Sequence, residues 1–275
     1  MRDVLVYSES YKVWSPGVEY AARLATAFDA HLTGIWICPS PSAAIPAFEA
    51  PELLALLFET TRQLEDEAFA AGPPFVDYVH KLGVHKTSWQ VAEGYVPDTL
   101  ALASRYHDLL VIDCSNDTPW GSLSAVGNIV MGSGIPSLVV PPGQLNLPAL
   151  DTVAIAWNGS AEALHAVHAA LPLLARALRV VILHGEQQQP ISMLSWRPPF
   201  DLASYLLRHG IAAESKRLND GNRDIGATLL AAAGHAGATL LVMGAYGHTR
   251  FSEWVLGGAT RSVLEQATIP VLMLH

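Results

Sequence analysis

The sequence predicts an α/β fold in two tandem units, each an open parallel sheet with helices on both faces. Three observations support this prediction. Apolar runs of strand length alternate with helical patterns, which is typical of a parallel sheet covered by helices. The same landmarks recur in the same order in both halves of the chain. Between the halves, PPGQLNLPAL at 141–150 has the prolines and the glycine expected of a linker.

The alternation is clearest in the second half of the chain. We expect strands at 153–157, 179–185, 213–219, 239–244 and 271–274, and helices at 161–177, 200–210, 225–236 and 259–267. The connections should be right-handed crossovers. Ligands of such sheets bind beyond the carboxyl ends of the strands, where the strand order reverses. The strand ends available there are Trp157-Asn158, His184 and Gly244.

The internal repeat is carried by three pairs of segments. These pairs are DVLVYSES (3–10) with TVAIAWNGS (152–160), HDLLVID (107–113) with ATLLVMG (238–244), and IPSLVV (135–140) with IPVLML (269–274). The first half is the longer one. Its extra length should lie at 39–72, which reads as a loop followed by a longer helix. The predicted domains are therefore residues 1–143 and 150–275.

Composition and charge argue against several classes of protein. A net charge of −9 argues against nonspecific binding to nucleic acid or to an anionic membrane surface. The two cysteines, Cys38 and Cys114, form neither a disulfide framework nor a CxxC motif, which fits a reducing compartment. The first residues contain no signal-peptide pattern, and no run of about 18 apolar residues occurs. The sequence therefore indicates a soluble cytoplasmic protein that neither binds nucleic acid nor enters a membrane.

A glycine-punctuated stretch, GAYGHTRFSEWVLGG at 244–258, lies between a predicted strand and the last predicted helix. Glycine lets backbone N–H groups approach a ligand, and a helix N-terminus suits phosphate. His248 and Arg250 could add positive charge. From the glycines alone, a turn and a helix start without a ligand are favoured, because such spacing is a weak signal.

This stretch closely resembles the nucleotide-binding signature of the universal stress protein family: Gly, two residues, Gly, nine residues, Gly, then Ser or Thr. Gly244, Gly247 and Gly257 match the three glycines, and AWNGSAEALHAV resembles the end of the family's first strand. The resemblance covers nearly the whole chain and is stronger in the second half. It implies a tandem member with two five-stranded sheets of Rossmann-like, adenine nucleotide alpha hydrolase-like fold. It also implies a pseudo-dimer that pairs the final strands, and ATP or related nucleotides as ligands of many members.

The chain departs from the family pattern at two positions. Gly258 replaces the Ser or Thr whose hydroxyl would contact phosphate, which could weaken affinity about 10- to 100-fold. Thr260 could compensate in part. Asn158 replaces an acidic residue expected beside the base, although an amide oxygen can still accept a hydrogen bond. We therefore expect a nucleotide site that is weaker than that of a typical family member.

The first half departs much further. Asp113 and Asn116 stand where Gly244 and Gly247 do, and the carboxylates of Asp113 and Asp117 would repel phosphate. Ser8-Glu9-Ser10 takes the place of Asn158-Gly159-Ser160. The first domain is therefore predicted to be a degenerate partner that does not bind ATP as the family does.

The resemblance implies a single adenine nucleotide site in the second half, for ATP, AMP or a related nucleotide, with or without Mg²⁺. Predicted base and ribose contacts are Ala156, Trp157, Asn158, His184, Met243 and Gly244. Predicted phosphate contacts are Gly247, His248, Gly257, Gly258, Ala259 and Thr260. Binding would act as a sensor or switch for protein partners in a stress response, in a chain that could also form homodimers.

No catalytic or metal-binding set is predicted. The sequence has no G-x-S-x-G elbow, Walker lysine motif or H-E-x-x-H motif, so we do not expect an enzyme. His165 and His168 have a spacing that could hold a metal, but no third ligand is evident. Two alternatives stay open: a scaffold that works without nucleotide, and a slow nucleotide hydrolase assisted by His248.

Overall fold

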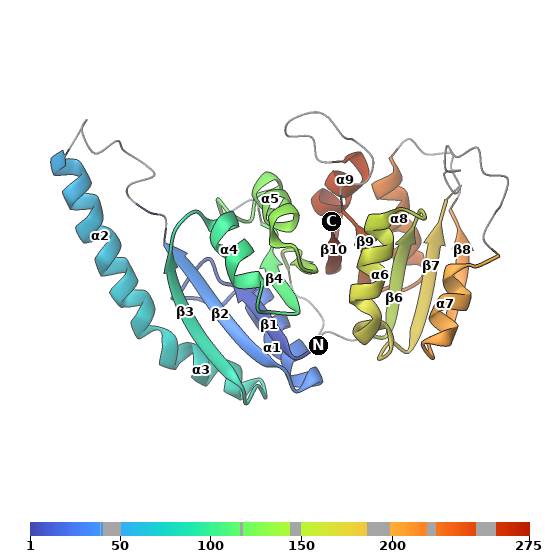
Figure 1. Cartoon of the computed structure of the whole chain (residues 1–275), viewed down its shortest axis with the longest axis horizontal. Coiled ribbons are helices and arrows are strands. Elements are labelled where there is room, and N and C mark those ends of the chain that lie inside the picture. Colours follow the sequence, from blue (N-terminus) through green and yellow to red (C-terminus); the bar gives the residue numbers. More distant parts are fainter. Residues whose placement is uncertain are drawn as a thin grey trace. The chain divides into compact units, whose positions relative to one another are not determined.

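The computed structural model describes residues 1–38, 40, 51–115, 118–143, 150–185, 199–218, 224–245 and 257–275. The chain divides into two compact units, Met1–Leu147 and Pro148–His275. Each unit is an α/β structure with helices around a parallel sheet (Figure 1), which confirms the predicted fold class. The pairing of the two units as a pseudo-dimer stays a prediction.

Among the described residues, the N-terminal unit has five parallel strands in the order β3-β2-β1-β4-β5. Its elements are β1 (Asp3–Tyr7), α1 (Pro16–Phe28), β2 (His31–Cys38), α2 (Pro51–Ala70), α3 (Gly72–Lys81), β3 (Thr87–Glu93), α4 (Val96–Ser104), β4 (Leu109–Asp113), α5 (Leu123–Ser133) and β5 (Ser137–Val140).

The C-terminal unit repeats this topology, with its described strands in the order β8-β7-β6-β9-β10. Its elements are β6 (Thr152–Trp157), α6 (Ala161–Leu174), β7 (Arg179–His184), α7 (Leu202–Arg208), β8 (Ala213–Arg217), α8 (Ile225–His235), β9 (Leu240–Gly244), α9 (Gly258–Gln266) and β10 (Val271–Leu274). Both units thus share one topology, as the internal repeat predicts.

The central strands form the core of each unit. β1 and β4 in one unit, and β6 and β9 in the other, are apolar runs that are buried along most of their length. Burial on both faces is characteristic of parallel sheets covered by helices. In the C-terminal unit α8 packs against α9, whereas α6 packs over β9 and β10 and α7 packs on β8. Right-handed crossovers with this strand order place α6 and α7 on one face of the sheet, and α8 and α9 on the other.

The strand order reverses beside β6. The chain runs outward from β6 through β7 to β8 and then crosses back to β9, on the other side of β6. β6 pairs in parallel with β9 from Val153↔Leu240 to Ile155↔Val242, and with β7 as far as Trp157↔His184. The carboxyl ends of these three strands therefore lie next to each other, at the place where such sheets bind ligands.

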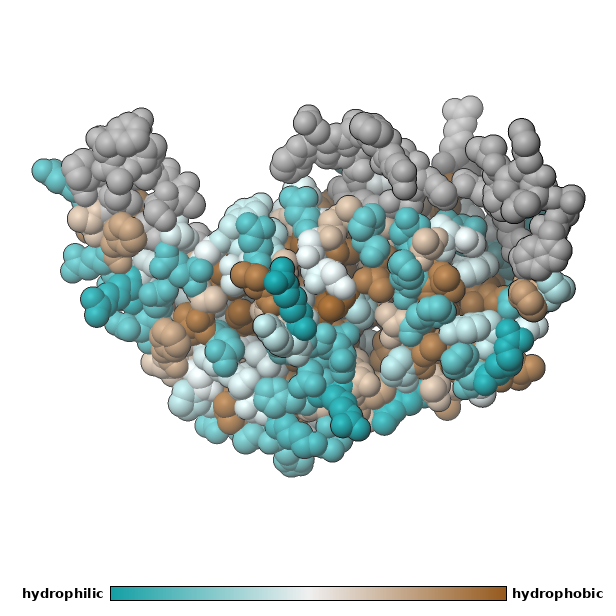
Figure 2. Space-filling view, in the orientation of Figure 1, coloured by the Kyte–Doolittle hydropathy of each residue, from teal (hydrophilic) through white to brown (hydrophobic). Residues whose placement is uncertain are grey.

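The extra length of the first half lies where the sequence predicts it, and it is more helical than expected. The long helix α2 is followed directly by α3, a second helix that the sequence analysis did not predict. Pro73 and Pro74 fall in the first turn of α3, where a helix does not need the backbone N–H. α2 also carries exposed large apolar side chains, and Figure 2 shows hydrophobic and hydrophilic residues side by side in the region of this helix.

Candidate functional site

The predicted base and ribose contacts lie at one edge of the C-terminal sheet. Ala156 and Trp157 are the last residues of β6 and are partly buried. His184 ends β7 and pairs with Trp157 in the sheet. Met243 and Gly244 end β9, and Met243 is buried. The fold thus brings together five residues that are separated by up to 88 positions in the sequence.

The turn between β6 and α6 is built by Asn158, Gly159 and Ser160. The side-chain oxygen of Asn158 accepts a hydrogen bond from the N–H of Ser160 at 3.0 Å. Gly159 has a φ of 79°, which side chains rarely adopt. Ser160 caps α6 by accepting a bond from the N–H of Ala163 at 3.2 Å. The Asn-Gly-Ser sequence is therefore explained by local structure, and Asn158 retains a second lone pair for a ligand.

Gly244 is required by the close approach of β9 to the start of α6. A Cβ at this position would lie 2.5 Å from the backbone nitrogen of Ala163 and 2.6 Å from the carbonyl carbon of Glu162. Neither backbone atom can move without shifting the helix. The first glycine of the predicted signature thus has a packing role whether or not a ligand is present.

The start of α9 differs from the other helix starts described in the C-terminal unit. Side chains of Ser160, Asp201 and Asp224 cap α6, α7 and α8. Gly257 is the N-cap of α9 and provides no side-chain hydrogen bond. Gly258 is exposed, and a Cβ there would meet no atom of the described residues within 4 Å. A helix start of this kind, with glycine at both Gly257 and Gly258, suits the approach of an anion to its backbone.

The remaining predicted phosphate contacts differ in how they are placed. Ala259 is partly buried in the first turn of α9, and Thr260 in the same turn is buried, with only 4% of its surface exposed. Gly247 and His248 lie outside the described residues, as does Arg250. The full set of site residues therefore stays a prediction, with ten of its twelve members placed by the fold.

In the N-terminal unit, the place of Gly244 is taken by Asp113 at the end of β4. Its carboxylate accepts hydrogen bonds from the hydroxyl of Ser15 at 2.5 Å and from the N–H of Gly17 at 2.7 Å. A Cβ on Gly17 would lie 2.5 Å from this carboxylate. The small and the large residue have thus exchanged places: Gly17 faces Asp113 in one unit, and Glu162 faces Gly244 in the other.

This arrangement places a negative charge of the protein itself at the N-terminus of α1. Ser15 is the N-cap of α1 and accepts a bond from Val18 N–H, so the counterpart of Ser160 as a helix cap is Ser15 and not Ser10. Burial raises the pKa of the Asp113 carboxyl, although the hydrogen bonds from Ser15 and Gly17 act in the opposite direction. Burial and the charge of Asp113 also raise the pKa of Glu9.

Aromatic side chains cover another strand end in the N-terminal unit. The Tyr11 ring meets the Trp36 ring of β2 edge-on, with centroids 5.0 Å apart. The Tyr11 hydroxyl donates to the carboxylate of Glu67 at 2.9 Å, and Trp36 packs with Cys38 in a buried cluster. The sequence analysis did not identify these contacts or those of Asp113. The Ser-Pro-Gly sequence at the start of α1 is the sequence feature that could have indicated the contacts of Asp113.

The sequence also raised a histidine pair and two cysteines as candidates. His168 packs against the ring of Tyr205, with centroids 5.4 Å apart. Over the described ranges, no three His, Cys, Asp or Glu side chains are grouped so that they could hold a metal ion. Cys38 and Cys114 are buried free thiols, and burial raises the pKa of Cys114 to about 11. No helix within the described part of the chain has the length and apolarity needed to span a membrane.

Fold and site together define a class: a tandem α/β protein with open parallel sheets and a glycine-rich helix start at the point where the strand order reverses. Residues 150–275 match the model of the universal stress protein family. The C-terminal unit thus matches that family, and the two-unit arrangement is consistent with a tandem member. This confirms the resemblance inferred from the glycine spacing.

Solved structures support the fold over the whole chain. A universal stress protein from Archaeoglobus fulgidus DSM 4304 superposes with a TM-score of 0.71 at 16% identity, covering 99% of this chain and 96% of the other. A functionally unknown protein from Pseudomonas aeruginosa PAO1 superposes with a TM-score of 0.56 at 16% identity, covering 100% of this chain and 92% of the other. None of the curated protein sequences matches the chain.

Proposed function

We propose that the C-terminal unit binds an adenine nucleotide, ATP or AMP, and that binding serves as a sensor or switch in a stress response. The base and ribose would lie over the carboxyl ends of β6 and β9, next to Trp157 and His184. The phosphates would lie at the start of α9. The observation that carries this proposal is the glycine start of α9, where Gly257 provides no side-chain cap and a Cβ on Gly258 would meet no described atom within 4 Å.

Physical chemistry supports the phosphate position. The first N–H groups of a helix have no partner within the helix, and the helix dipole favours negative charge at this end. Gly257 has φ −52° and ψ 133°, a conformation open to any residue, so backbone strain does not require glycine there. A different reason for glycine at Gly257 and Gly258 is that a residue without a side chain lets a ligand approach the backbone closely.

The N-terminal unit is proposed to lack a nucleotide site of this kind. The carboxylate of Asp113 already lies against the N-terminus of α1, so a phosphate near this position would meet a buried acid. The packing of Tyr11 on Trp36 fills space at the end of β2. We therefore propose one nucleotide per chain, with binding and not catalysis as the biochemical activity.

A nucleotide-independent scaffold is the second candidate. Packing alone accounts for Gly244, and a local turn accounts for Asn158 and Gly159, so neither feature needs a ligand. The replacement of the family's Ser or Thr by Gly258 is also expected if a phosphate site has been lost. This candidate does not explain the uncapped, glycine-only start of α9.

Nucleotide that remains bound through purification distinguishes the two candidates. Full-length protein would be purified without added nucleotide and denatured, and the supernatant would be separated to detect ATP, ADP and AMP. We expect an adenine nucleotide at up to one equivalent per chain, and saturable rebinding after it is removed. Protein that is free of nucleotide, and that shows no saturable binding of ATP or AMP up to about 1 mM, would favour the scaffold.

A further inference from the structure

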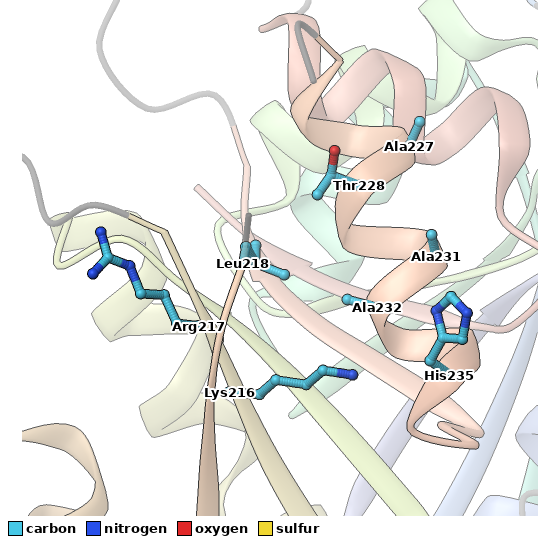
Figure 3. Close-up of a pocket in the computed structure, with 8 residues that line it drawn as sticks. All are labelled: Lys216, Arg217, Leu218, Ala227, Thr228, Ala231, Ala232 and His235. Carbon is cyan, nitrogen blue, oxygen red and sulfur yellow. The ribbon is translucent and has the colours of Figure 1, made fainter. Parts of the chain in front are cut away.

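A cavity of about 360 Å³ lies between β8 and α8 in the C-terminal unit (Figure 3). Its volume is at the lower end of the range of about 300–1,000 Å³ that is usual for small-molecule sites. Lys216 and Leu218 line it from the β8 side, and Ala227, Ala231 and His235 line it from α8. None of these residues belongs to the predicted nucleotide site.

The cavity exists because small side chains face an outer strand. β8 is the last strand in the order of this sheet, and residues 214–217 are exposed. Ala227, Ala231 and His235 are spaced four residues apart along α8, so they share one side of the helix. The alanine methyl groups leave the space next to the buried Leu218 unfilled. The floor of the cavity is consequently apolar.

The charge of the cavity is positive. Figure 3 shows the Lys216 side chain reaching from β8 toward α8, where His235 lies, whereas Arg217 points away from α8. None of the described residues that line it is acidic. Glu214, two positions earlier on β8, is held by Arg179 through hydrogen bonds of 2.9 and 2.7 Å. Among the described residues, the side chains of Lys216 and His235 have no hydrogen-bond or ion-pair partner.

The polar end of a ligand should therefore lie near Lys216. The ammonium group of lysine has three donors and no acceptor, and imidazole can donate an N–H in either protonation state. Thr228 also lines the cavity, but its hydroxyl donates to the carbonyl of Asp224 at 2.9 Å and is not an available donor. The chain as a whole carries a net charge of −9, so a basic cavity is a local exception.

We propose that this cavity binds a small organic anion. Its carboxylate or phosphate group would lie between Lys216 and His235, and its apolar part would rest on Ala227, Ala231 and Leu218. The site is separate from the nucleotide site, since it lies beside the outer strand β8 on the side facing α8. It is independent of the proposed function: either site can exist without the other.

The test is a titration followed by nuclear magnetic resonance on the full-length protein. Lys216 is the single lysine in residues 148–275, so loss of its signal in Lys216→Gln assigns it. The probes are benzoate and phenyl phosphate, which combine charge with an apolar ring. Matched probes are benzamide, which lacks the charge, and inorganic phosphate, which lacks the ring. We expect one of the two aromatic anions to shift the Lys216 and His235 signals saturably, with a Kd of about 1 mM, and both matched probes to bind at least about fivefold more weakly.

Variants make the test specific. Lys216→Gln should weaken binding of the aromatic anion about fivefold, and Ala231→Leu, which fills the floor, should abolish saturation. Lys81→Gln changes an exposed lysine of the N-terminal unit and should leave affinity unchanged. Gly257→Val should also leave it unchanged, which separates this site from the nucleotide site. Equal binding of benzoate and benzamide, unchanged affinity in Lys216→Gln, or no saturable shift with either anion would overturn the proposal.

Discussion

At the scale of single residues, the two units differ at the contact between the end of the fourth strand and the first helix. Where the fourth strand of each sheet ends against the first helix, only one of the two facing residues can be large. The N-terminal unit has Asp113 on the strand and Gly17 on the helix, and the C-terminal unit has Gly244 on the strand and Glu162 on the helix. The N-terminal unit thereby places a carboxylate from the sheet at the N-terminus of its first helix.

Gly244→Ala should destabilise the C-terminal unit by about 1–3 kcal/mol, because the added methyl group would overlap the backbone of Glu162 and Ala163. The matched control is Gly234→Ala in α8. Gly234 is exposed, with no atom within 4 Å of the added Cβ, so alanine there should stabilise by about 0.5–1 kcal/mol. Urea denaturation monitored by hydrogen exchange of β9 amides measures both effects. Equal effects of the two substitutions would show that the close approach at Gly244 is not constraining.

Asp113 should give the N-terminal unit a characteristic dependence on pH. Burial raises its pKa above the ordinary value of 3.8, so the folded state disfavours the ionised form. The contribution of protonated Asp113 to the free energy of unfolding is therefore fully present below pH 3.8, and it is lost as the pH rises through the raised pKa. Exposed acids with lowered pKa values, such as Asp29 and Glu67, have the opposite trend and must be subtracted.

The subtraction uses Asp113→Asn, which has nearly the same shape and does not titrate. We expect the stability of wild type relative to Asp113→Asn to fall as the pH rises from about 4 to about 8. Hydrogen exchange of the Gly17 amide, which donates to Asp113, reports this locally. A difference that is constant with pH would show that the hydrogen bonds from Ser15 and Gly17 cancel the effect of burial, and one that grows as the pH rises would show that they outweigh it; either result contradicts the prediction.

At the scale of elements, α9 is the part of the C-terminal unit on which the proposed function depends. The proposal places the phosphates at its start, but the hydroxyl found after the third glycine of the family pattern is missing. A Cβ at position 258 would meet no atom of the described residues within 4 Å, so we expect that this hydroxyl can be restored without rearranging the described part of the unit.

Gly258→Ser should therefore strengthen ATP binding about tenfold, which is the effect of one additional hydrogen bond to a charged oxygen. Gly258→Ala is the control: it removes the glycine without adding a donor, so its affinity should stay within about twofold of wild type. Equilibrium dialysis with radiolabelled ATP would measure all three proteins. If Gly258→Ser binds no better than Gly258→Ala, the phosphates do not lie at the start of α9.

At the scale of the whole molecule, the succession of strands and helices and the ends of the strands could be predicted from the sequence because both depend on local patterns. Apolar runs mark strands, and residues that follow them reach the same edge of a parallel sheet. The interaction of Asp113 with Ser15 could not be predicted, since it joins residues 98 positions apart and depends on how closely a strand meets a helix. The cavity beside β8 was missed for a related reason: alanines on α8 have no sequence signal that separates close packing from open space.

The central claim is that one nucleotide binds per chain, in the C-terminal unit, with its phosphates at the start of α9. Calorimetric titration of ATP–Mg into the full-length protein, beside Gly257→Val, tests it most directly. Valine fits the backbone conformation of Gly257, so the variant should fold while its side chain blocks the phosphates. The account predicts about micromolar binding at one site per chain in the wild type and none in the variant. Two sites per chain, equal binding by the variant, or no heat of binding up to about millimolar ATP would contradict it.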